Sequence, residues 1–289
     1  MKLNKLSEGD ILSKKLFKYD GYSIPEDLVM LTGGGTSDWK QISDYHVEMY
    51  RKYTPINPDD FILEVGCGVG RDAIELTKIL SPKGKYVGFD IIKPSIDWAK
   101  QNITKKHKNF TFHYYDIQSQ IHNNDGKITT TDIKLPAKDG SVDRIFLHSV
   151  FTHMYEKDIV HYLKEFKRVL KPDGLVIASF FILDEESLTR AHKGKGKKHR
   201  HPLTFEHTYG RGTYINDKNY PEGAIGFTPQ KIKSMLLRGG LGIHGGFAHR
   251  GAWSGIQPAA NGQDILILGK TSRRELVAQL SKPLKFTGR

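Results

Sequence analysis

The chain has 289 residues, of which 38% are hydrophobic and 26% are charged, and its formal net charge is +12. This composition fits a globular protein with one substantial core and an appendage, and it excludes a disordered or fibrous chain. No stretch reaches the roughly 18 apolar residues of a membrane-spanning helix, and the N-terminus lacks the apolar core of a signal peptide. Because the single cysteine, Cys67, cannot form an internal disulfide, we expect a cytoplasmic protein with no membrane partner.

The positive charge is concentrated in two segments. Residues 190–201 hold six Lys or Arg and no acid, whereas residues 271–289 hold five Lys or Arg and one Glu. Together they supply +10 of the +12, so the rest of the chain is nearly neutral. A basic loop and a basic tail are therefore expected, and a nucleic-acid-binding face is not.

The first 55 residues give mixed signals. An apolar patch at residues 28–31, a GGGTSD turn at 33–38 and a helical pattern at 43–53 predict an N-terminal helical lid. Two prolines between residues 54 and 58 mark its end.

From residue 61 onward, short apolar runs alternate with helical patterns. Strands are expected at residues 61–65, 85–90, 110–116, 143–150, 175–183 and 264–269. Helices are expected at residues 71–80, 94–106, 156–170 and 228–238, and glycine-rich turns after the last of these. This alternation predicts an α/β fold with a doubly wound, mainly parallel sheet. It is interrupted by residues 184–226, which we interpret as an insertion before the last helix.

A glycine-rich turn follows the first of these strands. Glycines stand at positions 66, 68 and 70, and Arg71 occupies the sixth position of the turn. The dinucleotide fingerprint needs glycine or alanine at that sixth position, and the phosphate loop needs a Gly-Lys-Ser/Thr ending that is absent. The turn can bring its backbone close to a ligand at the carboxyl edge of the sheet, but neither phosphate motif fits.

Glu64 and the three glycines after it resemble the first motif of class I S-adenosylmethionine-dependent methyltransferases. The block DRIFLHSVFTHM…RVLKPDG resembles a bacterial group that acts on small molecules, with Asp173 where that group usually has glycine. Trp253-Ser254-Gly255 and Gly262-Gln263-Asp264 extend the similarity, which covers about residues 56–183 and 228–270. The resemblance implies a Rossmann-like, seven-stranded methyltransferase core over residues 56–270. It also implies S-adenosylmethionine as cofactor and S-adenosylhomocysteine as product.

The resemblance also implies which residues contact the cofactor. Asp90, at the end of the second strand, can accept both ribose hydroxyls, and Asp116 can accept the adenine amino hydrogen. Ile91 and Ile117 can enclose the adenine ring, and Glu64 faces the cationic part of the ligand. The expected cofactor-binding residues are Glu64, Gly66, Gly68, Gly70, Asp90, Ile91, Asp116, Ile117 and His148.

The catalytic candidates follow the fourth strand. His153 is the first candidate for a general base, because imidazole accepts protons near neutrality; a structural or solvated histidine is the alternative. Asp264 is a second catalytic candidate, since it can orient the base or hold an acceptor hydroxyl. Trp253, Gln263 and Phe151 are expected to contact the acceptor, although a core tryptophan and polar residues at a strand start would also fit the pattern. No set of residues calls for a metal ion.

The favoured function is methyl transfer to an O or N atom of a small molecule, such as a sugar, a nucleotide-sugar or a biosynthetic intermediate. If the basic loop 190–201 is a lid, the acceptor is anionic; a solvated loop without a specific role is the alternative. Two other functions stay open: an RNA or DNA methyltransferase using that loop, and a non-catalytic cofactor-binding subunit. Against the nucleic-acid enzyme, no Asn/Asp-Pro-Pro-Tyr/Phe motif follows the fourth strand.

Overall fold

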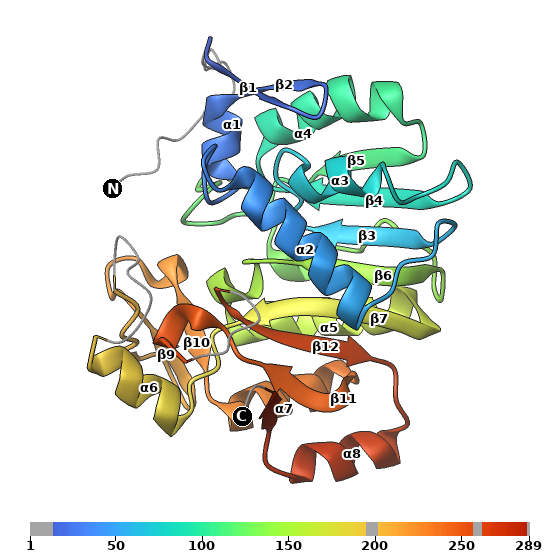
Figure 1. The fold of residues 1–289 in the computed structure, drawn as a ribbon. Coiled ribbons are helices and arrows are strands. Elements are labelled where there is room, and N and C mark those ends of the chain that lie inside the picture. Colours follow the sequence, from blue (N-terminus) through green and yellow to red (C-terminus); the bar gives the residue numbers. More distant parts are fainter. Residues whose placement is uncertain (1–13, 195–201, 257–261, 288–289) are drawn as a thin grey trace. The chain divides into compact units, whose positions relative to one another are not determined.

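The computed structural model describes residues 14–194, 202–256 and 262–287. The chain forms two compact units, residues 1–128 and residues 129–289, whose helices and strands are drawn in Figure 1.

The first unit is built around three parallel strands. Its elements in chain order are β1 (Leu16–Tyr19), β2 (Tyr22–Pro25), α1 (Glu26–Leu31), α2 (Trp39–Tyr53), β3 (Phe61–Val65), α3 (Arg71–Leu76), β4 (Lys85–Asp90), α4 (Lys93–Ala99), a π-helical turn (Lys100–Thr104) and β5 (Phe110–Tyr114). Strands β3, β4 and β5 pair side by side in that order. Helix α4 starts with Pro94 in its first turn, as predicted, and packs beside β4 and β5 (Figure 1).

The N-terminal segment differs from the expected helical lid. Strands β1 and β2 form an antiparallel hairpin before helices α1 and α2 begin. Residues 16–25 alternate between more exposed and more buried positions, which is a strand pattern over a stretch too short to detect reliably from sequence.

The second unit contains a five-stranded sheet and a smaller three-stranded sheet. Its helices and strands are β6 (Val142–Leu147), α5 (Glu156–Val169), β7 (Leu170–Phe180), α6 (Glu185–His192), β8 (His207–Thr208), β9 (Thr213–Ile215), β10 (Ile225–Phe227), α7 (Pro229–Gly239), β11 (Gly242–His249), β12 (Asp264–Gly269), α8 (Arg273–Ser281) and β13 (Lys285–Thr287). Short 3-10 turns occur at Thr130–Asp132 (η2), Phe151–His153 (η3), Pro221–Gly223 (η4) and Ala252–Ser254 (η5). The larger sheet has the order β13-β11-β12-β7-β6.

Most expected elements of this unit are confirmed. Helix α5 buries Ile159, Leu163 and Phe166, the face predicted from their spacing. Helix α7 begins after Thr228, whose hydroxyl accepts a hydrogen bond from the Lys231 amide. Strands β6 and β7 are parallel, whereas β12 is antiparallel to both of its neighbours.

Three expectations for this unit are wrong. The glycine-rich residues after α7 form strand β11, in which the register shifts between Ile243 and Ala248; Gly245 and Gly246 adopt positive φ there. Helix α7 is not the last helix, because α8 and then β13 follow β12 within the predicted basic tail. Three strands in the first unit and five in the second make eight instead of seven, and the Rossmann-like alternation of strands and helices is otherwise confirmed.

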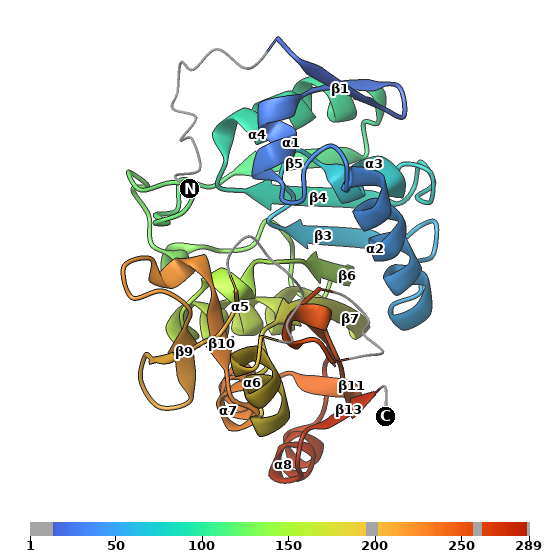
Figure 2. The same cartoon turned by 60° about the vertical axis from the view of Figure 1, so that its left-hand side comes forward.

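The interruption at residues 184–226 contains regular structure. Asp184 caps α6 by accepting a hydrogen bond from the Ser187 amide, and strands β8, β9 and β10 form an antiparallel sheet (Figure 2). Residues 195–201, the centre of the predicted basic loop, lie outside the described residues.

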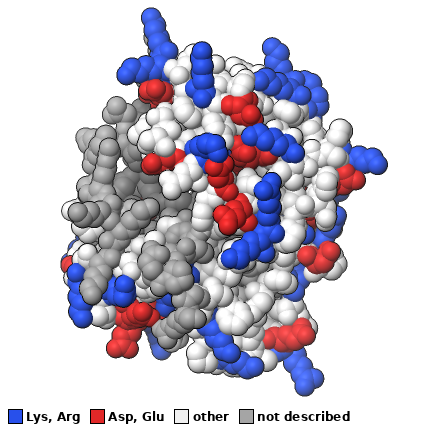
Figure 3. Space-filling model, viewed as in Figure 1, with Lys and Arg blue, Asp and Glu red and all other residues white. Residues whose placement is uncertain are grey.

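Charged side chains are mixed on the visible surface. On the parts of the two units that face the viewer in Figure 3, Lys and Arg alternate with Asp and Glu and do not merge into one basic surface. In the part of the chain that the structure describes, none of the helices combines the length and the apolar character needed to cross a membrane.

Candidate functional site

The glycine-rich turn joins β3 to α3 in the first unit. Gly66, Gly68 and Gly70 have φ angles of 71°, 54° and 93°, a region that residues with a Cβ rarely adopt. The amides of Gly66 and Cys67 both donate to the Phe89 carbonyl, at 2.9 and 3.2 Å. The turn is therefore a fixed loop whose backbone can approach a ligand closely.

Asp90, the last residue of β4, fastens this loop. Its Oδ2 accepts a hydrogen bond from the Gly68 amide at 2.7 Å, and its Oδ1 accepts one from the Ile92 amide at 2.9 Å. Burial raises the pKa of Asp90, and these backbone hydrogen bonds oppose that rise. The two oxygens offer about four acceptor positions, of which the Gly68, Ile92 and Ile91 amides take three, so the carboxylate keeps capacity for one more donor.

Glu64 lies on β3, two residues before the first glycine, and is buried. Its carboxylate accepts a hydrogen bond from the Tyr86 hydroxyl on β4. Burial, with the Asp72 carboxylate close by, raises the pKa of Glu64 well above its ordinary value. A cation next to Glu64 would offset this cost of burying charge.

Asp116 stands two residues after β5. Its Oδ1 accepts hydrogen bonds from the Tyr114 hydroxyl at 2.8 Å and from the Asn123 side-chain amide at 2.9 Å. The Asn123 and Tyr114 hydrogen bonds hold the pKa of Asp116 below its ordinary value, so this carboxylate stays ionised. Of the two isoleucines expected at the adenine ring, Ile91 is half-buried and Ile117 is buried.

The N-terminal segment docks on the glycine loop within the first unit. The Val69 amide donates to the Thr32 hydroxyl at 3.2 Å, and the Arg71 guanidinium donates to the Gly33 carbonyl at 2.9 Å. Arg71 also lies over the ring of Trp39, which is completely buried. Trp39 therefore anchors this segment beside the loop.

A buried network under the same loop was missed from the sequence. Asp72, in the first turn of α3, accepts hydrogen bonds from His46 Nδ1 at 2.8 Å and from the Tyr50 hydroxyl. His46 and Tyr50 are four residues apart and lie on one side of α2. No spacing signal relates them to Asp72, because the contact joins two helices that are distant in sequence.

In the second unit, His153 ends the η3 turn that follows β6. Its Nδ1 lies 2.7 Å from the carbonyl oxygen of Glu222 in η4, so Nδ1 donates a proton, and in the neutral imidazole Nε2 carries the lone pair. Nε2 lies 3.4 Å from the hydroxyl of Ser149, and this hydroxyl accepts a hydrogen bond from the Gln263 side-chain amide at 2.9 Å. The arrangement offers a proton-accepting nitrogen at an exposed polar surface.

Ser149 was not singled out from the sequence, although it belongs to the SVFTHM segment. It has a φ of 57°, which is uncommon for a residue with a Cβ. The Ser149 amide donates to the hydroxyl of the buried Ser179 at 2.7 Å. This contact with β7 holds the turn that brings Ser149 beside His153.

Comparison with known proteins identifies the family. A family model described as a methyltransferase domain matches residues 56–240. The chain belongs to the methyltransferase-domain family. It is 29% identical over 186 residues to an uncharacterised 37.1 kDa protein in transposon Tn4556 of Streptomyces fradiae, covering 64% of this chain and 44% of that protein. It is 27% identical over 173 residues to demethylmenaquinone methyltransferase of Lactobacillus johnsonii, covering 60% of this chain and 61% of that protein.

The chain thus spans less than two thirds of the length of either relative. Among solved structures, the PH0226 protein of Pyrococcus horikoshii superposes with a TM-score of 0.52 and 16% identity, covering 83% of this chain and 93% of that chain. At this identity the likeness concerns the fold, and it agrees with the Rossmann-like alternation described above.

Three residues expected at the acceptor, Asp264, Trp253 and Phe151, are buried in the structure. Asp264 is completely buried, and its carboxylate accepts hydrogen bonds from the Ile182 and Gly251 amides and from the Trp253 indole. Trp253 is 1% exposed and packs edge-on against Phe181 and Phe205. In this arrangement Asp264 anchors the chain and Trp253 belongs to a hydrophobic cluster, so neither can touch an acceptor.

Phe151 is also enclosed. It is completely buried against the rings of Tyr162, Phe166 and Phe180, so it supports the η3 turn from below and offers no surface to an acceptor. Gln263 remains available, since it is half-exposed at the start of β12. His148, directly after β6, is half-buried, and its assignment to the cofactor stays a prediction.

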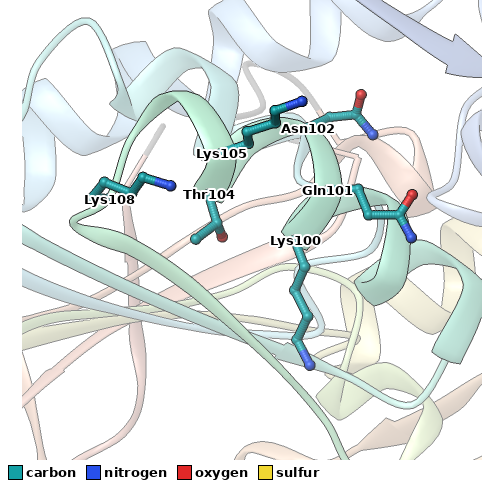
Figure 4. A pocket seen from close by; sticks show the side chains of 6 residues that line it. All are labelled: Lys100, Gln101, Asn102, Thr104, Lys105 and Lys108. Atoms are coloured by element: carbon teal, nitrogen blue, oxygen red, sulfur yellow. The ribbon is translucent and has the colours of Figure 1, made fainter.

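A hollow lies in the first unit, on the π-helical turn after α4. Its lining side chains all come from one short segment: Lys100, Gln101, Asn102, Thr104, Lys105 and Lys108 (Figure 4). None of the expected site residues lines this hollow, and it has no buried proton donor or acceptor pair.

Proposed function

We propose that this chain is an S-adenosylmethionine-dependent methyltransferase that methylates an O or N atom of a small molecule, with His153 as general base. The tautomer of His153 carries the proposal: the hydrogen bond from Nδ1 to the Glu222 carbonyl leaves Nε2 as the proton-accepting atom. Membership in the methyltransferase-domain family supports the reaction class. The relative named as a demethylmenaquinone methyltransferase supports a small acceptor, such as a sugar, a nucleotide-sugar or a biosynthetic intermediate.

The residues of the first unit fit the cofactor. Asp90 keeps an acceptor position for a ribose hydroxyl beside its three backbone donors, and Asp116 stays ionised, with its Oδ2 able to accept an amino hydrogen. The loop from Gly66 to Gly70 would lie against the methionine part, with Glu64 beneath it. When bound, S-adenosylmethionine supplies a methyl group on a positively charged sulfur.

The protein's own residues would manage the acceptor proton. The bond from the acceptor O or N to the methyl carbon forms as the sulfur–methyl bond breaks, and the acceptor proton passes to His153 Nε2. Ser149 and Gln263 would orient the acceptor hydroxyl or amine toward that nitrogen.

Two measurements test the proposal: calorimetric binding of S-adenosylhomocysteine, and its release from S-adenosylmethionine with a panel of acceptors. We expect wild type to bind the product, and His153→Ala to bind it equally well while losing about 10²- to 10⁴-fold in turnover. His161→Ala is the matched control, because His161 donates to the Ile133 carbonyl in the same unit and has no proposed chemical role. Unchanged turnover in His153→Ala would refute the general base, and absent product binding in wild type would refute the cofactor.

A further inference from the structure

The hydrogen bond that holds the His153 imidazole joins two segments that are distant in sequence. Its donor, His153 Nδ1, lies in η3, and its acceptor, the backbone carbonyl of Glu222, lies in η4. The η4 turn belongs to residues 216–224, which connect β9 to its antiparallel partner β10 and which we name the β9–β10 loop. Because the acceptor is a backbone carbonyl, the geometry of this bond depends on the conformation of the loop.

Backbone hydrogen bonds close the β9–β10 loop. At its base the Asn216 amide donates to the Ala224 carbonyl at 3.1 Å. Further along, the Tyr220 amide donates to the Asp217 carbonyl at 3.3 Å, and the Gly223 amide donates to the Tyr220 carbonyl at 3.0 Å. The last of these bonds closes the η4 turn.

The Glu222 carbonyl and the Gly223 amide belong to the same peptide group. A trans peptide is planar, and its C=O and N–H point in opposite directions. The N–H donates to the Tyr220 carbonyl on one side, and the C=O accepts from His153 Nδ1 on the other. A rotation that turned this carbonyl away from the imidazole would therefore also break the bond to Tyr220.

Glycine is required at position 223 by a close approach and not by its backbone angle. A Cβ at this position would lie 2.7 Å from Cδ1 and 3.3 Å from Cε1 of the Tyr220 ring, and the φ of Gly223 lies outside the left-handed region. The ring of Tyr220 therefore covers the α-carbon of the residue whose amide orients the peptide.

Both partners of the His153 bond are fastened to β7 and its continuation. The Ser149 amide, shortly before η3, donates to the hydroxyl of Ser179 on β7 at 2.7 Å. At the end of β10, the Phe227 amide donates to the Phe181 carbonyl, and the Phe227 carbonyl accepts from the Leu183 amide, both at 2.9 Å. This common support fixes the segment that carries the imidazole and the strand that follows the loop.

We propose that the β9–β10 loop is a positioning element for the base, in which the Glu222–Gly223 peptide selects the tautomer of His153 that has a proton-accepting Nε2. Gly223 is thus a positioning residue, which acts through His153 and does not touch the acceptor. This inference rests on the proposed function, because it takes His153 as the general base. It gives the inserted segment a role in catalysis that does not depend on the basic loop 190–201.

The physical effect follows from the single proton of a neutral imidazole. The ring nitrogen that has a hydrogen-bond acceptor keeps this proton, and the other nitrogen carries the lone pair. Without the Glu222 carbonyl the proton can move to Nε2. In that tautomer Nε2 can donate a hydrogen bond but cannot take the proton of the methyl acceptor.

The tautomer can be read directly in the wild-type chain. Long-range ¹H–¹⁵N NMR spectra distinguish the two tautomers at alkaline pH, where imidazoles are neutral, and His153→Ala identifies which signals belong to His153. We expect wild type to show the Nδ1–H tautomer. A predominant Nε2–H tautomer in wild type would overturn the inference.

Two double variants isolate the contribution of the peptide group. Tyr220→Ala removes the ring that would collide with a Cβ at position 223, so Gly223→Ala and Gly223→Pro can be compared on that background. Alanine keeps the amide N–H, whereas proline removes it and disfavours the helical backbone of Glu222.

We expect Tyr220→Ala/Gly223→Ala to keep the Nδ1–H tautomer and Tyr220→Ala/Gly223→Pro to shift protons to Nε2. With the acceptor found in the panel, kcat should be about three- to ten-fold lower in the proline variant than in the alanine variant. Both should bind S-adenosylhomocysteine equally in calorimetry, which also shows that both are folded. An unchanged Nδ1–H tautomer in the proline variant would contradict the proposal.

These experiments separate the inference from the proposed function. The NMR spectra need no turnover, so the wrong tautomer in a protein that His153→Ala inactivates would refute only the role of the loop. Conversely, the expected change of tautomer together with unchanged turnover in His153→Ala would refute only the general base.

Discussion

Asp90 and Asp264 are two buried carboxylates that do the same structural task in different units. Each stands at the end or the start of a strand, and each accepts backbone amide hydrogen bonds that fix a neighbouring turn. They differ in exposure and in side-chain partners. Asp90 is 7% exposed, whereas Asp264 is 0% exposed and also accepts a hydrogen bond from the Trp253 indole. An acid at a strand end is therefore a better candidate for a ligand contact where the residue keeps some exposure and an open acceptor position.

The comparison extends to the two regions around these acids. The glycine loop is made mostly by backbone atoms of consecutive residues, with Asp90 as its fastener. The surface around His153 is made by the side chains of Ser149 and Gln263 and by the backbone carbonyl of Glu222, which come from separated segments. A backbone site tolerates few substitutions in its own loop, whereas a side-chain site can be altered one contact at a time.

The largest expected effect comes from adding one methyl group to the loop that Asp90 fastens. In Gly68→Ala the new Cβ would meet Thr32 Cγ2 at 2.7 Å. The residue would also have to keep a φ of +54°, which alanine adopts only at a cost of about 1–2 kcal/mol. Movement of the loop would break the bond between the Gly68 amide and Asp90. We expect S-adenosylhomocysteine to bind about ten- to one-hundred-fold more weakly in calorimetry.

Gly140→Ala is the matched control for that variant. Gly140 has a φ of +62° with nothing within 4 Å of an added Cβ, so the backbone strain is similar but no neighbour is displaced. Its unfolding free energy should fall by about 1–2 kcal/mol while product affinity stays unchanged. If both variants bound the product as wild type does, the loop would not be the cofactor site.

The same contrast explains what the sequence could predict. The sequence placed Gly66, Gly68 and Gly70 in a turn beside Asp90, and the structure joins Gly68 to Asp90, because this arrangement follows from a strand, a turn and the next strand; their role in cofactor binding stays a prediction. The burial of Trp253 and Phe151 could not be predicted from the sequence, because it depends on partners such as Phe181 and Phe180, which lie far away in sequence; for Trp253 it agrees with the core position that the sequence left open as an alternative. Ser149 and Glu222 reach His153 through a rare backbone angle and an inserted turn, and neither carries a local signal.

A second, smaller effect concerns the completely buried carboxylate of Asp264. Burial raises the pKa of Asp264 to about 6, so the folded state binds a proton more tightly than the unfolded chain does. The stability from this group therefore increases as pH falls through about 6. Between pH 7.5 and pH 5 we expect wild type to gain about 1.4 kcal/mol of unfolding free energy relative to Asp264→Asn, measured by urea denaturation. Histidines titrate in both proteins and cancel in the difference, and a relative loss of stability toward pH 5 would contradict the assignment.

The smallest expected effect concerns Ser149, where two variants separate the role of the hydroxyl from that of the backbone conformation. Ser149→Ala and Ser149→Gly both remove the hydroxyl that lies between His153 and Gln263, but only glycine relieves the φ of 57°. Because a single such hydrogen bond contributes about 0.5–1.5 kcal/mol, both variants should lower kcat/KM by about three- to ten-fold. Denaturation should show Ser149→Gly to be the more stable of the two by about 1 kcal/mol. If turnover followed stability, Ser149→Gly would retain the wild-type rate and Ser149→Ala would not. That result would show that Ser149 contributes through its backbone turn and not through its hydroxyl.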